Sequence, residues 1–323
     1  MITPFAFEAV VAFLGAMVCA ACSLLYFQRV RLDRPAIGVF NGRDIAVLLG
    51  FIVVLPFLYI IIPPLGLIGV LTLTFVCAMY VALRPLVRPR YIWLTAVVLL
   101  GSQVLVTYYA QHGWSTGWQV YWLILNLIVL IAAVGVSNLY VQGGMRLRHV
   151  AWFALLLGVY DITFTWVYPL TPILADHFIG KALDPSIGFQ MGFYRANIGL
   201  GDLLVYCLFT VAAYKGFGKR GAIAAFITIP IFGVLVPAFA PFLIIQFVRA
   251  GVGVVVPAQT AFGPVAFLTY LWLKRSAPER SMAEWFKVQN AALAKEPAIS
   301  AAQPGQVKQP ALAEVQSSVQ GSD

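Results

Sequence analysis

Residues 196–206 read ANIGLGDLLVY and place an acid, Asp202, near the start of a run that stays apolar to Ala213. Such a run predicts a membrane-spanning helix, because about 20 apolar residues are needed to cross a bilayer. An Asp at the centre of a spanning helix costs about 2.5 to 3.5 kcal/mol on insertion scales. Each neighbouring Leu, Ile, Val or Phe returns only about 0.3 to 0.6 kcal/mol. One Asp therefore offsets the favourable insertion free energy of about six apolar residues, so we expect Asp202 to have a role beyond spanning the membrane.

A second acid, Asp161, lies deep in the preceding apolar run, which reads LLLGVYDITF over residues 155–164. Of the 12 acidic residues in the chain, only Asp161, Asp202 and Glu8 lie well inside apolar runs. Measured from the predicted outer ends of their helices, the two aspartates differ in depth by about 6 Å. This difference is within the error of the predicted helix ends, so the two acids can meet in adjacent antiparallel helices.

The composition is that of a membrane protein, with 61% hydrophobic and 10% charged residues, whereas a soluble domain carries about 25% charged residues. The net charge of +9 does not argue for nucleic acid, because the basic residues sit in short loops, where they orient a membrane protein. The four cysteines lie in apolar runs, and the three histidines lie in loops or at helix ends. No disulfide framework, metal site or cofactor is therefore expected.

Apolar windows of about 20 residues predict an all-α integral membrane protein with nine transmembrane helices. The nine windows cover residues 5–28, 44–62, 65–84, 91–110, 118–141, 149–172, 194–214, 221–247 and 252–273. Lys and Arg gather after the odd windows, Lys215 among them, whereas the loops after even windows carry only Lys181, Arg195 and Arg249. By the positive-inside rule, the N-terminus is expected outside and the C-terminus in the cytoplasm, in a multi-pass protein of the cell membrane.

We expect three regions along the chain. Residues 1–148 form an N-terminal five-helix membrane region, residues 149–275 form the catalytic membrane region with spans six to nine, and residues 276–323 form a cytoplasmic tail. In the tail, the sequence SMAE at residues 281–284 has the form of a capping box and predicts a short amphipathic helix at the membrane surface. The rest of the tail is mostly Ala, Gln, Pro and Ser and is expected to be disordered.

Small residues are expected to bring the acids together. Gly158 lies three residues before Asp161 and Gly199 three residues before Asp202, on the same helical faces, while Gly201 adjoins Asp202. Small residues allow membrane helices to pack closely. Glycine also weakens helices, so the start of the seventh span is expected to be partly unwound.

Two carboxyl groups in contact cannot both ionise at neutral pH, so they share a proton. The ionised group can take a proton from a water molecule that attacks a peptide carbonyl, and the protonated group can donate to the carbonyl oxygen. The same pair can instead form a structural hydrogen bond or a path for protons. From the residues alone, peptide hydrolysis and these alternatives all stay open.

The residues around the two acids resemble two motifs of a known family. Tyr160-Asp161 and Gly199-Leu200-Gly201-Asp202 are similar to the YD and GxGD motifs of the presenilin and signal peptide peptidase family. These are intramembrane aspartyl proteases with nine spans, in which the motif aspartates of spans six and seven form the catalytic dyad. The resemblance covers roughly residues 149–273. It implies a presenilin-like bundle in which Asp161 and Asp202 are catalytic.

The family's third motif, Pro-Ala-Leu at the start of the ninth span, is imperfect in this chain. Pro257-Ala258-Gln259 lies at the corresponding place but has Gln where the family has Leu. The sequence PAF at residues 237–239 is closer in character but lies in the eighth window. We assign the motif to Pro257 and Ala258, which implies that they shape the active site and seat the substrate. The departure at Gln259 bears on substrate handling more than on the dyad.

The predicted orientation resembles that of signal peptide peptidase and is the reverse of presenilin's. It implies substrate helices with a cytoplasmic N-terminus, such as spent signal peptides or type II anchors. The expected partners are a transmembrane-helix substrate and the lipid bilayer, and the need for protein subunits stays open. The alternative function is a multi-pass proton- or cation-coupled transporter that uses the same two aspartates.

Three further expectations concern the surroundings of the acids. Water must reach them, and polar residues are expected to line a cavity for it: Thr163, Thr165 and Tyr206. The loop between the sixth and seventh spans either gates entry or is a solvated connection, and its charged residues are Asp176, His177, Lys181 and Asp184. An aromatic belt is expected at the outer interface from Trp114, Trp118, Tyr121 and Trp122.

Overall fold

A computed structural model describes most of the chain outside the predicted tail. The described residues are 2–32, 42–168, 170, 173, 181–187, 198–241, 256–281 and 283–288. The chain divides into two compact units, Met1–Met282 and Ala283–Asp323. Residues 283–288 of the second unit are helical, where the sequence predicts a short helix, and the part of the tail expected to be disordered lies outside the described residues.

The first unit is built almost entirely from helices. The α-helices are α1 (Ile2–Arg29), α2 (Gly42–Ile61), α3 (Pro64–Leu83), α4 (Pro89–Gln111), α5 (Gly117–Gln142), α6 (Leu147–Ile162), α8 (Leu200–Phe217), α9 (Lys219–Thr228) and α11 (Ala258–Ser276). Two π-helical segments, η1 (Thr163–Val167) and η2 (Ile229–Leu235), continue α6 and α9. Within the described residues, 8 helical segments are long and apolar enough to cross a membrane, and α11 is not among them. The chain is therefore an all-α, multi-pass membrane protein.

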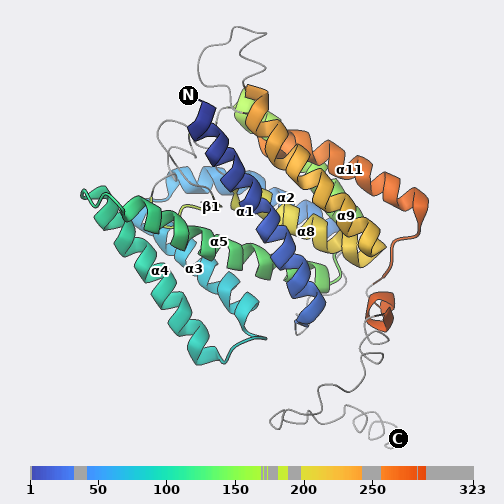
Figure 1. Ribbon diagram of the computed structural model, residues 1–323, viewed down its shortest axis with the longest axis horizontal. Coiled ribbons are helices and arrows are strands. Elements are labelled where there is room, and N and C mark those ends of the chain that lie inside the picture. Colours follow the sequence, from blue (N-terminus) through green and yellow to red (C-terminus); the bar gives the residue numbers. More distant parts are fainter. Residues whose placement is uncertain are drawn as a thin grey trace, which may run out of the picture. The chain divides into compact units, whose positions relative to one another are not determined.

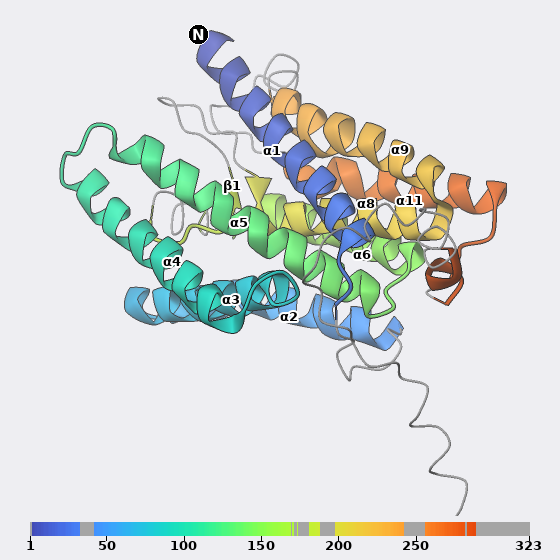
Figure 2. The same ribbon diagram turned by 60° about the horizontal axis from the view of Figure 1, so that its bottom comes forward.

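Helix α5 forms the centre of the packing. It contacts α3 and α4 on one side and α8 on the other, as Figure 2 shows, and α1 crosses both α5 and α8 (Figure 1). Leu125 and Ile128 of α5 are completely buried. A Cβ atom at Gly135 of α5 would lie 2.4 Å from the Cβ atom of Ala82 in α3. Small residues therefore let these helices approach closely, as is common in membrane proteins.

A cluster of neutral polar side chains joins α1 to α5 inside the bundle, and we name it the Asn138 cluster. The hydroxyl groups of Ser23 and Ser137 are 2.8 Å apart, and Asn138 Nδ2 donates to Ser23 Oγ at 3.0 Å and to the Ser23 carbonyl at 3.1 Å. All three side chains are completely buried. Hydrogen bonds of this kind link membrane helices that have no water to bond to.

The helix pair α6 and α11 has the most extensive packing among the described elements. A Cβ atom at Gly263 of α11 would lie 2.4 Å from the carbonyl oxygen of Ala154 in α6. A Cβ atom at Gly158 of α6 would lie 2.8 Å from the carbonyl oxygen of Gln259 in α11. The expectation that Gly158 brings the sixth and seventh spans together is therefore wrong, because the start of α11 packs against Gly158 instead.

Lys215 occupies an unexpected place at the end of α8. The prediction that it lies in a loop after the seventh span is wrong, because it belongs to the last turn of α8 and its side chain is completely buried. Its ammonium group donates to the carbonyl oxygen of Met145 and, at 3.5 Å, to that of Val141. Val141 lies in the last turn of α5 and Met145 just after it, so Lys215 links the end of α8 to the end of α5.

Candidate active site

Asp161 is the penultimate residue of α6, and its side chain is half-buried. The α-helix ends at Ile162 and continues as the π-helical segment η1. Such a widened turn is often found at functional sites, because it re-aims side chains without ending the helix. Asp161 therefore lies where the helical geometry changes, within the segment Leu147–Val167 that is long and apolar enough to span a membrane.

Asp202 lies in the first turn of α8, directly after a short strand. Strand β2 (Ile198–Gly199) pairs antiparallel with β1 (Ser186–Ile187), and the Leu200 amide donates to the Pro185 carbonyl at 2.7 Å. The predicted start of the seventh span at residue 194 is therefore wrong, because the helix begins at Leu200. The expectation of an unwound start is confirmed at residues 198–199, which are extended. A carboxylate in a first helical turn is also favoured by the helix dipole.

The two acids come together although 40 residues separate them. Helix α6 packs against α8, and the carboxyl group of Asp161 lies in the electrostatic field of Asp202. Tyr206, one turn after Asp202, is completely buried and faces the charges of both acids. The two carboxyl groups are therefore close enough to interact electrostatically. Two like charges at such a site repel strongly unless a proton is held between them.

Gln259 connects both acids to a third helix, α11. Its side-chain Nε2 donates to Asp202 Oδ1 at 2.9 Å. Its backbone amide lies close enough to the Asp161 carboxyl group to interact with it electrostatically. Pro257 caps the start of α11 and Ala258 is its first residue, so the segment expected to shape the active site reaches the dyad through its third residue.

The glycines of the GxGD motif have different surroundings. A Cβ atom at Gly199 would lie 3.8 Å from Asp202 Oδ2, which is ordinary contact, and a Cβ atom at Gly201 would meet nothing within 4 Å. Gly201 is exposed. Neither glycine therefore permits a close helix approach, contrary to expectation. Gly199 serves instead as the extended residue that precedes α8.

The tyrosines beside the acids are packed against aromatic rings. The Tyr160 ring lies 4.5 Å from that of Phe164, and the Tyr206 ring lies 4.9 Å from that of Phe262. The Tyr206 hydroxyl donates to the Gly233 carbonyl in η2 at 2.7 Å. The expectation that Tyr206 lines a water cavity is therefore wrong, because its hydroxyl serves to join α8 to η2.

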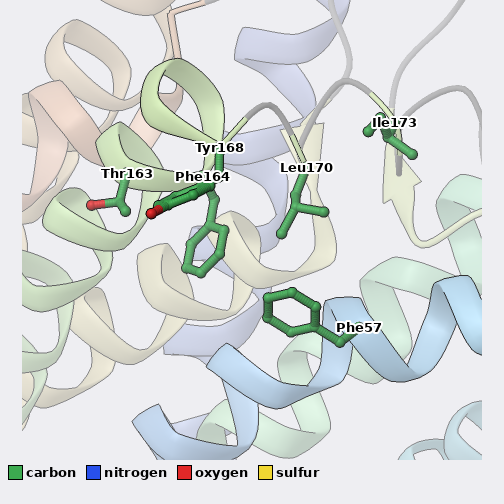
Figure 3. Close-up of a pocket in the computed structure, with 6 residues that line it drawn as sticks. All are labelled: Phe57, Thr163, Phe164, Tyr168, Leu170 and Ile173. Carbon is green, nitrogen blue, oxygen red and sulfur yellow. The ribbon is translucent and has the colours of Figure 1, made fainter.

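An apolar cavity of about 440 Å³ lies on the side of η1 that faces α2. Figure 3 shows Phe57 of α2 opposite Phe164 of η1, with ring centroids 6.1 Å apart. The lining residues are Phe57, Thr163, Phe164, Tyr168, Leu170 and Ile173. Of the three polar residues expected to line a cavity, Thr163 lines this one, and its hydroxyl donates to the Val159 carbonyl. Thr165 is buried elsewhere.

The segment 181–187 forms a buried support for the strand pair. Leu183 and Asp184 are almost completely buried, and Ser186 Oγ donates to Asp184 Oδ1 at 2.7 Å. Tyr121 of α5 donates its hydroxyl to the Lys181 carbonyl at 2.8 Å. The solvated connection expected here is therefore wrong for residues 183–187. Asp176 and His177 lie outside the described residues.

The four residues of the expected aromatic belt differ in burial. Trp114 and Trp118 are exposed, as an interfacial belt requires, whereas Tyr121 and Trp122 are buried. The buried pair supports the segment that leads to Asp202. Position along the sequence alone does not distinguish the two roles.

The sequence analysis identified the two acids but missed the contacts of Gln259 and Tyr121. A polar residue at the start of an apolar span was the available signal for Gln259, and it was treated only as a departure from a motif. Within the described ranges, no three His, Cys, Asp or Glu side chains are grouped as a metal site requires. No protein-family model matches the chain, and no curated protein matches it significantly in sequence.

Proposed function

We propose that the chain is an intramembrane aspartyl protease that hydrolyses peptide bonds within transmembrane helices. The observation that carries the proposal is that Asp161 and Asp202 lie on packed apolar helices, close enough to interact electrostatically, with Gln259 of α11 bonded to Asp202. Bringing two acids together in a membrane is costly. Proteases that use two aspartates need this arrangement, since one carboxyl group must be ionised while the other is protonated.

The proposed reaction adds one water molecule across one peptide bond. The ionised carboxylate takes a proton from the water as its oxygen attacks the peptide carbonyl carbon, and the protonated carboxyl group donates to the carbonyl oxygen. The resulting gem-diol then breaks its C–N bond as a proton passes to the departing nitrogen. The products are a free carboxyl group and a free amine, and the pair of acids again holds one proton.

The apolar cavity beside η1, the segment that follows Asp161 in the chain, supports a peptide substrate of apolar character. The cavity between η1 and α2 is lined by apolar and aromatic side chains apart from Thr163 and the Tyr168 hydroxyl. Its volume of about 440 Å³ suits one or two large side chains of a substrate helix. Tyr160, Gly199, Leu200 and Gly201, together with Pro257 and Ala258, then shape the site around the two acids.

The proposal includes the topology. Helix α11 is the ninth span, the N-terminus lies outside and the C-terminus lies in the cytoplasm of a cell membrane. The distribution of Lys and Arg between alternate loops supports this orientation. The substrates are then helices with a cytoplasmic N-terminus, such as signal peptides or type II anchors. The lipid bilayer is the other partner.

The test is a cleavage assay with purified protein in detergent and a labelled transmembrane peptide of type II orientation. Wild type is compared with Asp161→Ala and Asp202→Ala, and a type I peptide is run in parallel. The proposal expects a product from the wild type alone and preferential cleavage of the type II peptide. Equal cleavage by all three proteins would contradict it. Proton flux into liposomes that requires both acids, without cleavage, would favour a transporter.

A further inference from the structure

Gln259 touches both acids from a helix that supplies neither of them. Its Nε2 is 2.9 Å from Asp202 Oδ1, while its backbone amide lies close enough to the Asp161 carboxyl group to interact with it electrostatically. We propose that Gln259 is the positioning residue of the dyad, holding Asp202 in the orientation that faces Asp161. This inference rests on the proposed function, because it assigns a role in the same site.

Gln259 is buried, and one of its two amide atoms has a hydrogen-bond partner while the other does not. Gln259 is only 2% exposed. Its second amide atom, Oε1, is buried without a hydrogen-bond partner among the described residues. A buried polar atom left unpaired is destabilising, and an apolar side chain of similar size at this place would avoid that cost. The hydrogen bond to Asp202 is the evident compensation.

The backbone around Gln259 is held firmly enough for its side chain to act as a fixed donor. The Gly158 position lets the Gln259 carbonyl lie directly against α6, and Gly263 brings the next turn of α11 against Ala154. The two close approaches fix the depth of α11 relative to α6. The amide of Gln259 therefore reaches Asp202 from a constrained backbone.

The geometry also divides the oxygen atoms of Asp202 between two tasks. Oδ1 accepts the hydrogen bond from Gln259, and this leaves Oδ2 free to hold the proton or to orient a water molecule. A carboxylate held by a directional amide donor keeps one rotamer, so the distance between the reacting oxygens stays constant. Misplacement of a catalytic group by about 1 Å can cost about 100-fold in rate.

The test replaces the donor while keeping the length of the side chain. Gln259→Met removes the N–H groups but remains unbranched and of similar volume. We expect kcat to fall about 10- to 100-fold, because a hydrogen bond to a charged group is lost, and KM to change less than about threefold, because the apolar substrate contacts remain. A residue that only fills space would leave both constants nearly unchanged.

The chain offers a matched control in α4. Gln103 is completely buried, and both of its amide atoms have no partner among the described residues. Gln103→Met makes the same chemical change at a residue of α4, which supplies none of the groups around the dyad. We expect this variant to retain the wild-type kcat and KM.

A second measurement does not require cleavage. The infrared spectrum of the wild type minus that of Asp202→Asn gives the carboxyl bands of Asp202. We expect Gln259→Met to shift these bands and Gln103→Met to leave them in place. If wild type cleaves peptide and Gln259→Met has the same kcat and the same bands, the inference is wrong and the protease proposal stands. If wild type cleaves nothing but the bands shift, the protease proposal fails and the positioning of Asp202 is supported.

Discussion

Two groups of polar side chains lie inside the bundle, and they differ in the charge they carry. In the Asn138 cluster, the hydroxyls of Ser23 and Ser137 and the amide of Asn138 are neutral donors and acceptors that complement one another. At the dyad, Asp161 and Asp202 are both acids, and Asp161 lies in the electrostatic field of Asp202. The first arrangement lowers the free energy of the folded protein. The second raises it unless a proton or a donor intervenes.

The difference separates stability from function. The neutral groups of the Asn138 cluster bond across helices where no water is present, although Asn138 Oδ1 is buried without a partner among the described residues. Two acids brought together repel each other, and their presence requires a compensating role. If this distinction holds, changes at the cluster alter the stability of the protein, and changes near the dyad alter its activity.

The largest effect is expected where helix packing sets the position of Gln259. Gly158→Ala places a methyl group 2.8 Å from the Gln259 carbonyl oxygen, a backbone atom that moves only with α11. We expect cleavage to fall about 100-fold, because Gln259 and the acids are displaced from one another. Overpacking also lowers the free energy of unfolding by about 1 to 3 kcal/mol. The measurements are cleavage rate and thermal unfolding on the same preparation.

Two glycines serve as controls for this change. A Cβ atom at Gly101 in α4 or at Gly201 beside Asp202 would meet nothing within 4 Å. Both alanine variants are expected to unfold within about 0.5 kcal/mol of wild type. Gly101→Ala should also cleave normally, whereas loss of activity in a stable Gly201→Ala would indicate substrate contact there. Normal cleavage by Gly158→Ala would contradict the importance of the α6–α11 contact.

An intermediate effect, on stability alone, is expected at the Asn138 cluster. Asn138→Leu removes two hydrogen bonds to Ser23 and one to the Val134 carbonyl. The free energy of unfolding should fall by about 1 to 2 kcal/mol, because interhelical bonds in membranes are individually modest. The kcat of the folded fraction should not change. A folded Asn138→Leu protein without activity would break the distinction between the two regions.

The smallest effect is expected at the support beneath the strand pair. Tyr121→Phe removes the hydrogen bond to the Lys181 carbonyl and leaves the ring in place. We expect the free energy of unfolding to fall by about 1 kcal/mol. We expect kcat to fall by less than about threefold, because the lost hydrogen bond affects Asp202 only indirectly, through β1 and β2. Tyr109→Phe, at an exposed residue of α4, is the control and should match wild type in both measurements.

The sequence predicted the features that depend on local composition. Apolar runs predicted the spanning helices, and the exceptional cost of an acid within them identified Asp161 and Asp202 before any geometry was known. Glycine before Asp202 correctly predicted an extended start of the seventh span, because glycine favours neither helix nor strand strongly. Each of these inferences uses only the free energy of a residue in its own segment.

The sequence did not predict features that depend on which helices meet. Gly158 was assigned to the contact with the seventh span, but the helix that lies against it is α11. Lys215 follows an apolar run as a loop residue does, but carbonyl groups at the end of α5 give it a buried partner. Gln259 was a mismatch in a motif until its distance to Asp202 was known. Side-chain spacing along one helix does not identify the neighbouring helix.

The most direct test of the account is Asp202→Asn, with cleavage and thermal unfolding measured on one sample. The amide oxygen of Asn can still accept the hydrogen bond from Gln259, so the packing of α8 and α11 is kept. The account predicts that cleavage is lost while the unfolding temperature stays equal to that of wild type or rises, because one of two repelling acids is gone. Retained cleavage, or loss of folding together with cleavage, would contradict a catalytic role for Asp202.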